Sequence, residues 1–580
     1  MRHRIGVALF LAVCFPLLLF AQTDTVYVPD AFESGEGTLN AAVTAAINAG
    51  TLSSKVFKLK SYGLYILNET ITIPLGTRLT IVGDEPGTDQ QTAPPQIVWS
   101  ASGGITTSYN FDCFGDIVMK NIWLLYANTA GNQTGTSLRI QDTPDEINGQ
   151  HATFEGVIFD YSQIGADGSG AVSVTSRHFR GKFTNCYFRN CMDPHFRYYG
   201  RAVSFPFNST GWHTDSLSFL HCTFTNLGYV LMQEGSEYTD HLSFNHCTFV
   251  NTVQFALEST WWHWLAVTNS VFVNTYMFGD VGENNGLPFG GTIAIDSVSN
   301  FGFTPPFTDP ERHILFTNSS YCVEPWLLDW MANNPYADTA STLNDPKPMP
   351  MLNNRSLMFF DTTDGSGNKL WPYMNRANLY DNANPNFVLP PNNVEAIKQF
   401  LLYKWTNNAD TNWAYDPGAS LTQTWPLPEN LRIPTSNPLK TAGMDGHPLG
   451  DLYRWDRSRY IAWKAQEETE NAQIQSWLVN GITGVADQKP GIPTNFELSQ
   501  NYPNPFNPVT NIDYSIPQTG QVSLKVYDLL GQEVATLFDG EQRLGNYTIK
   551  FNGSNLGSGV YFYRLQSGTT SISKKLLLMK

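Results

Sequence analysis

Four stretches of the chain read almost alike, and they constrain its fold more than any other feature. They are FTNCYFRN from Phe183, FLHCTFTN from Phe219, FNHCTFVN from Phe244 and VTNSVFVN from Val267. Self-similarity at a spacing of about 20–50 residues is typical of a solenoid, in which each unit stacks on its neighbours. Equivalent residues of successive units then lie side by side, so the repeat also supplies a register for locating a site.

Each repeat reads as two short strands joined by a tight turn. In the second copy, Leu217 and Phe219 are expected to face inward before the turn, and Cys222 and Phe224 after it. Asparagine tolerates the left-handed backbone that such turns need, and histidine is enriched there as well. The turn positions predicted for the four copies are Asn185, His221, His246 and Asn269. This placement favours a structural role for the two histidines over a catalytic one.

Three cysteines occupy the same place in the repeat. Cys186, Cys222 and Cys247 are therefore expected to form a column of small apolar core residues, since their spacing matches no zinc motif. Pairing of Cys191 with Cys186, or of Cys113 with Cys322, stays open in an oxidising compartment.

The first 21 residues have the pattern of a secretory signal. Arg2 and Arg4 precede an apolar run that ends at Phe20, with a cleavage site expected before Gln22. No later stretch is apolar enough to predict a transmembrane helix in the mature chain. The net charge of −16 argues against a nucleic-acid partner.

The remainder divides into four predicted parts. Residues 22–330 are expected to form the solenoid, with Thr38 as the N-cap of an amphipathic helix from Leu39 to Gly50 that covers its first coil. Residues 331–480 are rich in Trp, Pro and Asn, and we expect them to cap the other end with two helices, over 394–405 and 457–479. A separate helical domain is the alternative. Residues 481–493 read as a linker.

Residues 494–580 alternate short strands with turns and predict an Ig-like antiparallel β-sandwich. The segments FELSQNYPNPFNPVTNIDYSIP, VSLKVYDLLGQEVATL and GNYTIKFNGSNLGSGVYFYRLQSG closely resemble a type IX secretion C-terminal sorting domain. The resemblance implies export by the outer-membrane type IX secretion machinery. It implies a protein that is secreted or held at the outer cell surface of a Gram-negative bacterium.

The repeats resemble the right-handed parallel β-helix of the pectate-lyase-like superfamily over residues 24–330. The predicted fold class is therefore all-β, a right-handed parallel β-helix solenoid followed by the small sandwich. That superfamily includes lyases, glycosidases, esterases, adhesins and tailspikes, so the resemblance leaves the reaction open.

Three acids follow the repeats at nearly the same offset. Glu234, Glu258 and Asp280 each end an apolar stretch, and side-by-side strands would place them about 4.8 Å apart. We expect such a row to be catalytic or to hold a cation such as calcium. Arg197 and Arg201 of the preceding coil are expected to serve as base or charge clamp.

An aromatic cluster follows Glu258. Trp261, Trp262 and Trp264, with His263, are expected to contact a sugar ring, because aromatic faces stack on sugars. Packing of the loop against the solenoid is the alternative.

Three functions stay open for this protein. A polyuronate lyase would use the cation to acidify the proton beside the sugar carboxylate, and a glycoside hydrolase would use two of the carboxylates. The chain lacks clear copies of the superfamily's paired-Asp and Arg-centred motifs, so its being an enzyme is undecided. The prediction is a cell-surface protein that binds an extracellular polysaccharide and, as a lyase or hydrolase, cleaves it. The alternative is a non-catalytic adhesin or surface structural protein.

Overall fold

A computed structural model describes most of the chain after residue 23. The described residues are 24–101, 109–132, 134, 136–142, 149–162, 170–191, 200–205, 213–233, 238–253, 256–258, 262–277, 283–284, 287–288, 293–298, 305–333, 350–391, 394–405, 424–482, 496–501, 504–518, 520–542 and 545–579. The predicted signal peptide, 1–21, lies outside them.

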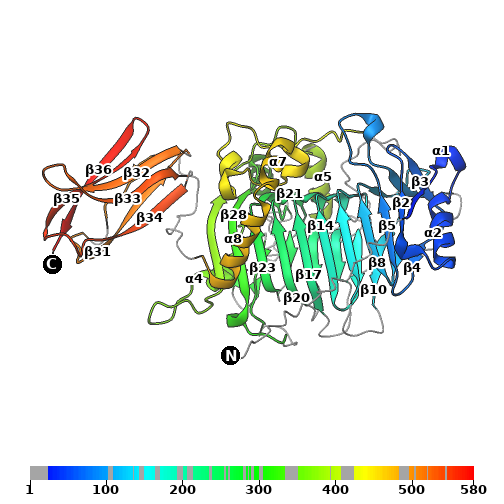
Figure 1. Cartoon of the computed structure of the whole chain (residues 1–580), viewed down its shortest axis with the longest axis horizontal. Helices are drawn as coiled ribbons and strands as arrows, with labels where there is room; N and C mark the ends of the chain where they lie inside the picture. Colours follow the sequence, from blue (N-terminus) through cyan, green and yellow to red (C-terminus); the bar gives the residue numbers. More distant parts are fainter. Residues whose placement is uncertain are drawn as a thin grey trace, which may run out of the picture.

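Three rows of parallel strands, called the first, second and third sheets below, run along the stack of coils (Figure 1), and the long strand β28 (His313–Cys322) joins the first two into one 19-stranded sheet. The first sheet contains β1 (Asp24–Tyr27), β2 (Lys55–Lys58), β5 (Arg78–Val82), β8 (Asp116–Lys120), β11 (His151–Glu155), β14 (Phe179–Thr184), β17 (His213–Leu220), β20 (Tyr238–Asn245), β23 (Trp262–Thr268), β28 (His313–Cys322) and β29 (Met374–Asp381). Each strand pairs in parallel with the equivalent strand of the next coil, as a β-helix requires.

The second and third sheets repeat this arrangement. The second contains β3 (Leu64–Leu67), β6 (Gln96–Trp99), β9 (Trp123–Asn128), β12 (Ile158–Asp160), β15 (Tyr187–Cys191), β18 (Thr223–Leu227), β21 (Thr248–Thr252), β24 (Val271–Thr275) and the end of β28. The third contains β4 (Ile71–Ile73), β7 (Tyr109–Cys113), β10 (Ser137–Gln141), β13 (Val172–Thr175), β16 (Arg201–Phe205), β19 (Tyr229–Gln233), β22 (Leu257–Glu258) and β27 (Ile293–Ala294). A short hairpin, β25 (Glu283–Asn284) with β26 (Leu287–Pro288), lies outside these sheets. The predicted parallel β-helix is confirmed.

The turn between the first and second sheets is where the repeat predicts it. Asn185, His221, His246 and Asn269 have φ angles of 60°, 50°, 52° and 51°, all in the left-handed region. The histidines therefore occupy backbone positions that few other side chains tolerate, which agrees with their predicted structural role.

A second column of left-handed asparagines follows one strand later. Asn226 Nδ2 donates to Asn190 Oδ1 at 3.3 Å, Asn251 to Asn226 at 3.2 Å, and Asn274 to Asn251 at 3.1 Å. These are the residues that end each sequence copy. Their amides form a continuous ladder that satisfies buried polar groups from coil to coil.

Aromatic rings stack through the interior in the same register. The ring centroids of Phe183 and Phe219 lie 4.7 Å apart, and those of Phe219 and Phe244 lie 4.6 Å apart. The six cysteines among the described residues are buried and unpaired, and Cys186, Cys222 and Cys247 lie in this core as predicted. The interior is thus one continuous apolar column.

The first coil is covered by two helices, α1 (Ala31–Ser34) and α2 (Thr38–Asn48). The helix predicted over 39–50 is present as α2, but its N-cap residue is Gly37, with a φ of 74°, and the predicted N-cap, Thr38, is already helical. Leu39 and Val43 are buried against the solenoid, so the helix protects the end of the core.

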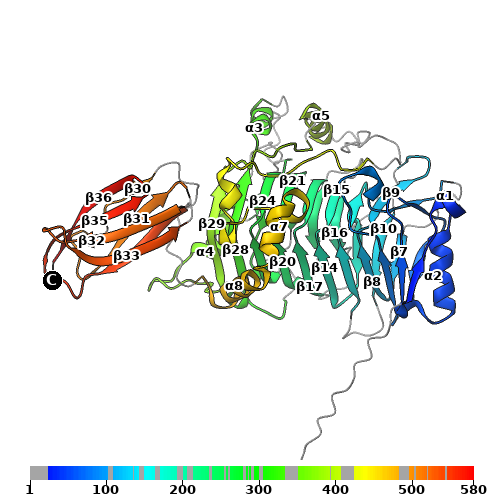
Figure 2. The same cartoon turned by 45° about the horizontal axis from the view of Figure 1, so that its top comes forward.

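Helices of the region 331–480 pack along the side of the stack as well as near its end (Figure 2). They follow α3 (Pro325–Ala332) and comprise α4 (Asn354–Asp361), α5 (Val394–Trp405), α6 (Leu452–Trp455), α7 (Arg457–Lys464) and α8 (Glu467–Asn480). The helix predicted over 394–405 matches α5. The one predicted over 457–479 is divided between α7 and α8, which are separated by Ala465 and Gln466. Ile474 and Leu478 of α8 pack against the solenoid residues Ala266 and Leu315.

Residues 331–480 are called the side region from here on. Buried charged side chains attach this side region to the solenoid. Arg189 Nη1 lies 3.1 Å from Asp160 Oδ2, and its Nε lies 3.3 Å from Glu429 Oε1, with all three side chains at most 1% exposed. Glu470 of α8 accepts hydrogen bonds from Asn245 and Trp463, and its Oε2 lies 3.3 Å from His246 Nε2.

We expect the attachment of α8 to weaken in acid. Burial alone would raise the pKa of Glu470, but His246, Asn245 and Trp463 outweigh it and lower the pKa to about 2. A carboxyl whose folded pKa is depressed contributes stability above its unfolded value, so this contribution should be lost as pH falls from about 4.5 to 2. The expected loss is on the order of 2–3 kcal/mol. Unfolding midpoints measured from pH 6 to pH 2 should fall less steeply in Glu470→Gln, and equal slopes would contradict the prediction.

The C-terminal module is a two-sheet antiparallel sandwich, as predicted. One sheet orders β30 (Glu497–Leu498), β31 (Val509–Ile516) and β34 (Gly545–Asn552). The other orders β33 (Glu533–Gln542), β32 (Gly520–Tyr527), β35 (Gly559–Ser567) and β36 (Thr570–Leu578). It has its own apolar core.

Within the described residues, no helix is both long and apolar enough to cross a membrane.

Candidate functional site

The structure gives a register for only one of the three predicted acids, Glu258. Glu258 lies opposite Met232 on one neighbouring strand and opposite Ala294 on the other. Among the described residues, the next strand in this sheet after β22 is β27. The predicted stacking of Glu234, Glu258 and Asp280 therefore stays a prediction. The residues Glu234 and Asp280, and the side chain of Glu258, lie outside the described part.

Of the two arginines predicted to act as base or charge clamp, only Arg201 is among the described residues, and its burial does not fit that role. Arg201 on β16 is 1% exposed, and its guanidinium carbon lies 5.8 Å from the ring centroid of Tyr229. It is thus part of the packed wall and has no open face for a substrate. Arg197 lies outside the described residues.

The aromatic cluster is divided between core and surface. Trp262 is fully buried in the apolar column, so the alternative of packing holds for it and sugar contact is ruled out. His263 and Trp264 are half-buried on the outer face of the first sheet. Trp261 lies outside the described residues.

His263 belongs to a larger set of polar groups on this outer face. We call the set the histidine row, and it includes six of the 11 histidines of the chain. It comprises Asp116, His151, His178, Arg180, His213, Asp215, Asp240, His241, His263, Trp264 and His313, carried on or next to β8, β11, β14, β17, β20, β23 and β28. Parallel pairing places these seven strands side by side.

An irregularity in pairing puts two carboxylates into the row. Thr214 lies opposite Phe179 and Ser216 opposite Arg180, which leaves Asp215 as an extra residue in β17. A bulge of this kind re-aims a side chain, and bulges are common next to functional sites. The next strand follows the same path, since Thr214 pairs with Thr239. Asp240 therefore follows Asp215 along the face.

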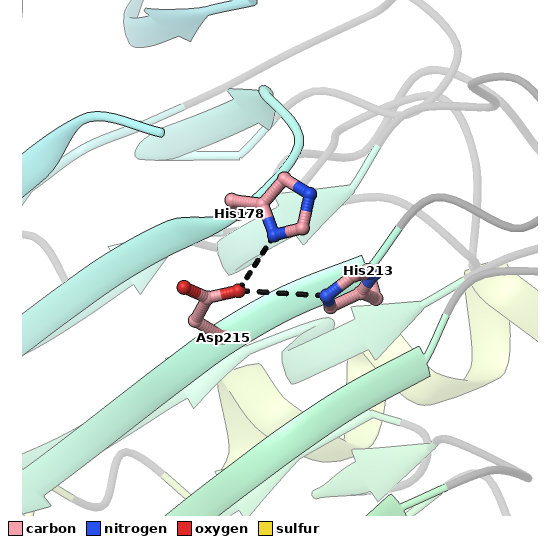
Figure 3. A group of neighbouring side chains, drawn as sticks. All are labelled: His178, His213 and Asp215. Atoms are coloured by element: carbon pink, nitrogen blue, oxygen red, sulfur yellow. Dashed lines mark hydrogen bonds and ion pairs between the residues drawn. The ribbon is translucent and has the colours of Figure 1, made fainter. Parts of the chain in front are cut away.

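The bulge carboxylates contact three imidazoles, and Figure 3 shows two of these, His178 and His213, beside Asp215. His178 Nδ1 lies 2.9 Å from Asp215 Oδ1, and His213 Nε2 lies 3.5 Å from the same oxygen. His213 Nε2 is also 3.5 Å from Asp240 Oδ2, and His263 Nδ1 is 3.4 Å from Asp240 Oδ1. The arrangement alternates imidazole and carboxylate over four coils. It therefore offers both proton transfer and metal coordination.

These contacts determine the protonation of Asp215 and His213, which form the centre of the row. Burial alone would raise the pKa of Asp215, but hydrogen bonds from His178 and Arg180 outweigh it and lower the pKa below its usual value. Arg180 Nε and Nη2 lie 2.9 and 2.8 Å from Asp215 Oδ2. Burial lowers the pKa of His213, against the opposing effect of Asp240. At neutral pH the centre thus combines an ionised carboxylate with a neutral imidazole.

The row continues in both directions from this centre. Toward the N-terminal coils, Asp116 and His151 line a pocket of about 490 Å³ together with Arg78 and Gln150. Toward the other end, the ring of Trp264 stacks on His313 at 3.7 Å between centroids. The row is a long surface feature rather than a single pocket.

A second pocket lies beside the second sheet. It has a volume of about 560 Å³, and Trp425, Tyr453 and Trp455 contribute aromatic walls. Glu429 in its lining is already paired with Arg189, so this buried carboxylate serves the fold. The histidine row is the stronger candidate site.

A signal for the row was present in the sequence but was missed. Its main column lies three residues before the inward apolar residue of each coil, as His241 lies before Phe244 and His313 before Phe316. Extending the repeat alignment three residues toward the N-terminus would have found this column. The bulge residues Asp215 and Asp240 show no such regularity.

Comparison with known families identifies the last part of the chain. Residues 500–579 match the family model described as the secretion system C-terminal sorting domain. No curated protein matches the chain. The β-sandwich is therefore a type IX sorting module, and the protein is exported by that route to the cell surface or the extracellular space.

Proposed function

We propose that the protein binds an extended extracellular polysaccharide along the histidine row and cleaves it there. The observation that carries this proposal is the continuity of the row over seven adjacent strands. At about 4.8 Å per strand the row is roughly 30 Å long. That length suits a linear polymer better than a small metabolite, and an exported protein meets such polymers outside the cell.

Acidic sugars are the substrate class that the side chains favour. The guanidinium of Arg180 is half exposed, and the neighbouring imidazoles can donate hydrogen bonds to a carboxylate. The lowered pKa of Asp215 makes it unsuitable as the proton-donating acid of a hydrolase, which needs a raised pKa. Neutral imidazoles instead suit the removal of a proton at neutral pH. These features favour a polyuronate lyase over a glycoside hydrolase.

In such a lyase the base takes the proton from the carbon beside the sugar carboxylate. The electron pair forms a carbon–carbon double bond, the bond to the glycosidic oxygen breaks, and that oxygen receives a proton. We assign the base to His263, since Asp240 can hold its Nδ1 proton and leave Nε2 as the acceptor. This role for the His263–Asp240 pair makes the proposal testable at one residue.

We expect turnover of a polyuronate to appear as absorbance of an unsaturated uronate. A panel of polyuronates and neutral glycans would be tested for that absorbance and for released reducing ends. His263→Ala should slow cleavage by about 10²–10⁴-fold, the usual contribution of a positioned base, with glycan binding largely retained. The matched control is Glu155→Gln, an exposed carboxylate of the same sheet that pairs with Lys120 outside the row.

The outcomes separate the competing functions. Binding without any product would support an adhesin and contradict cleavage, whereas reducing ends without the unsaturated product would indicate a hydrolase. No binding to any glycan of the panel would overturn the proposal as a whole.

A further inference from the structure

We propose that His178, His213 and Asp215 form a binding site for a divalent transition metal ion such as Zn²⁺. The inference deepens the proposed function and rests on it for the role of the ion, because a metal there would neutralise the carboxylate of a bound uronate. Metal binding itself is independent of any glycan, so the two can be tested apart.

The spacing of the three ligand atoms suits a metal. One atom from each side chain lies within 4.8 Å of the other two. His178 Nδ1 and His213 Nε2 are 2.9 and 3.5 Å from Asp215 Oδ1 (Figure 3). Ligands that bind Zn²⁺ tetrahedrally at 2.0–2.2 Å are about 3.3 Å from one another. Only small side-chain movements would therefore be needed to surround an ion.

The ligands are also held in place by their neighbours. The backbone N–H of His178 donates to the carbonyl of His213 at 2.9 Å, which ties the two coils together. The His213 ring stacks on Tyr238 with centroids 4.8 Å apart and planes 9° apart. Arg180 holds Asp215 Oδ2 and leaves Oδ1 directed toward the imidazoles. Such supporting contacts orient ligands and typically strengthen a metal site about 10–100-fold.

The donor set selects the kind of ion. Two imidazole nitrogens and one carboxylate match zinc and related transition metals, whereas calcium prefers six to eight oxygens. The site thus differs from the calcium site expected at Glu234, Glu258 and Asp280. All three side chains of the new site are half-buried, so an ion can enter from solvent.

Three protein ligands would leave a coordination position open, as in catalytic zinc sites. A uronate carboxylate can take that position, and the ion would then acidify the adjacent proton. His263, held by Asp240, lies beside this site and remains available to receive that proton. The row would in this way divide metal binding and proton transfer between adjacent coils.

The test is a titration of chelator-treated full-length protein with Zn²⁺ alone, with the heat of binding measured by calorimetry. We expect one tight site per chain, and a loss of affinity of at least about 100-fold in His178→Ala and in Asp215→Ala. Glu155→Gln is the matched control, since Glu155 lies on the same sheet but pairs with Lys120 outside the row, and it should keep the wild-type affinity. Co²⁺ would report nitrogen and oxygen coordination through its visible absorption, and circular dichroism would verify that each variant is folded.

Equal Zn²⁺ affinity in the wild type and in folded His178→Ala and Asp215→Ala would overturn the metal site. Polyuronate cleavage that persists in chelator, together with that result, would leave the proposed function standing without a metal. Zn²⁺ binding that the two variants abolish, with no cleavage of any glycan, would establish the metal site and remove the lyase.

Discussion

Replacement of Arg189 by methionine is expected to destabilise the solenoid by about 3–5 kcal/mol. The substitution leaves Asp160 and Glu429 buried without a cation, in a place where the three side chains are at most 1% exposed. Burial already raises the pKa of Asp160, so an unpaired carboxylate there is costly. Because Glu429 belongs to the side region, we also expect that region to detach first and to become sensitive to protease.

Tryptophan fluorescence during chemical denaturation would measure this effect. All 15 tryptophans lie between Trp99 and Trp477, so the signal does not report on the sorting module. Lys120→Met is the control, since it removes the cation of an exposed ion pair and should cost at most about 1 kcal/mol. Replacement of Asp160 and Glu429 by Leu and Met together with Arg189→Met should recover stability. A single Arg189→Met variant as stable as the wild type would contradict the assignment.

Truncation of Phe219 to alanine is expected to cost about 3–5 kcal/mol as well, but for a different reason. Its ring lies between those of Phe183 and Phe244, at 4.7 and 4.6 Å, so truncation opens a cavity within the stacked column. Neighbouring rings are held by their own coils and cannot close the gap. The same fluorescence transition should move to lower denaturant concentration.

Phe32→Ala provides the matched control for that experiment. Phe32 is 80% exposed on α1, so its truncation should change the unfolding midpoint little. Equal destabilisation by the two substitutions would mean that the aromatic column does not carry the stability of the coils.

Much of the fold was predictable because the repeat reports backbone geometry directly. Asn185 and His221 were placed at a turn from sequence alone, since few residue types tolerate a positive φ. The amide ladder from Asn190 to Asn274 was harder to foresee. These residues were recognised as the ends of copies, but a contact between coils depends on loop lengths that the repeat does not record.

The site was less predictable, for a physical reason. The acids Glu234, Glu258 and Asp280 were compared by their distance along the chain, whereas a sheet aligns residues by hydrogen-bond register. Glu258 pairs with Ala294 on the next described strand, so an offset counted along the chain does not follow the register of this sheet. Asp215 is an example of a contact that the chain offset does not predict. One extra residue in β17 brings it beside His178, although nothing in its local sequence suggests a partner.

The six buried thiols have a consequence for following the protein under stress. Cys113, Cys186, Cys191, Cys222, Cys247 and Cys322 are distributed along the stack over five coils, and all are shielded in the folded chain. A thiol reagent can reach each one only after its own coil has opened. Brief alkylation at increasing temperature, read peptide by peptide in a mass spectrometer, would therefore show from which end the solenoid unravels.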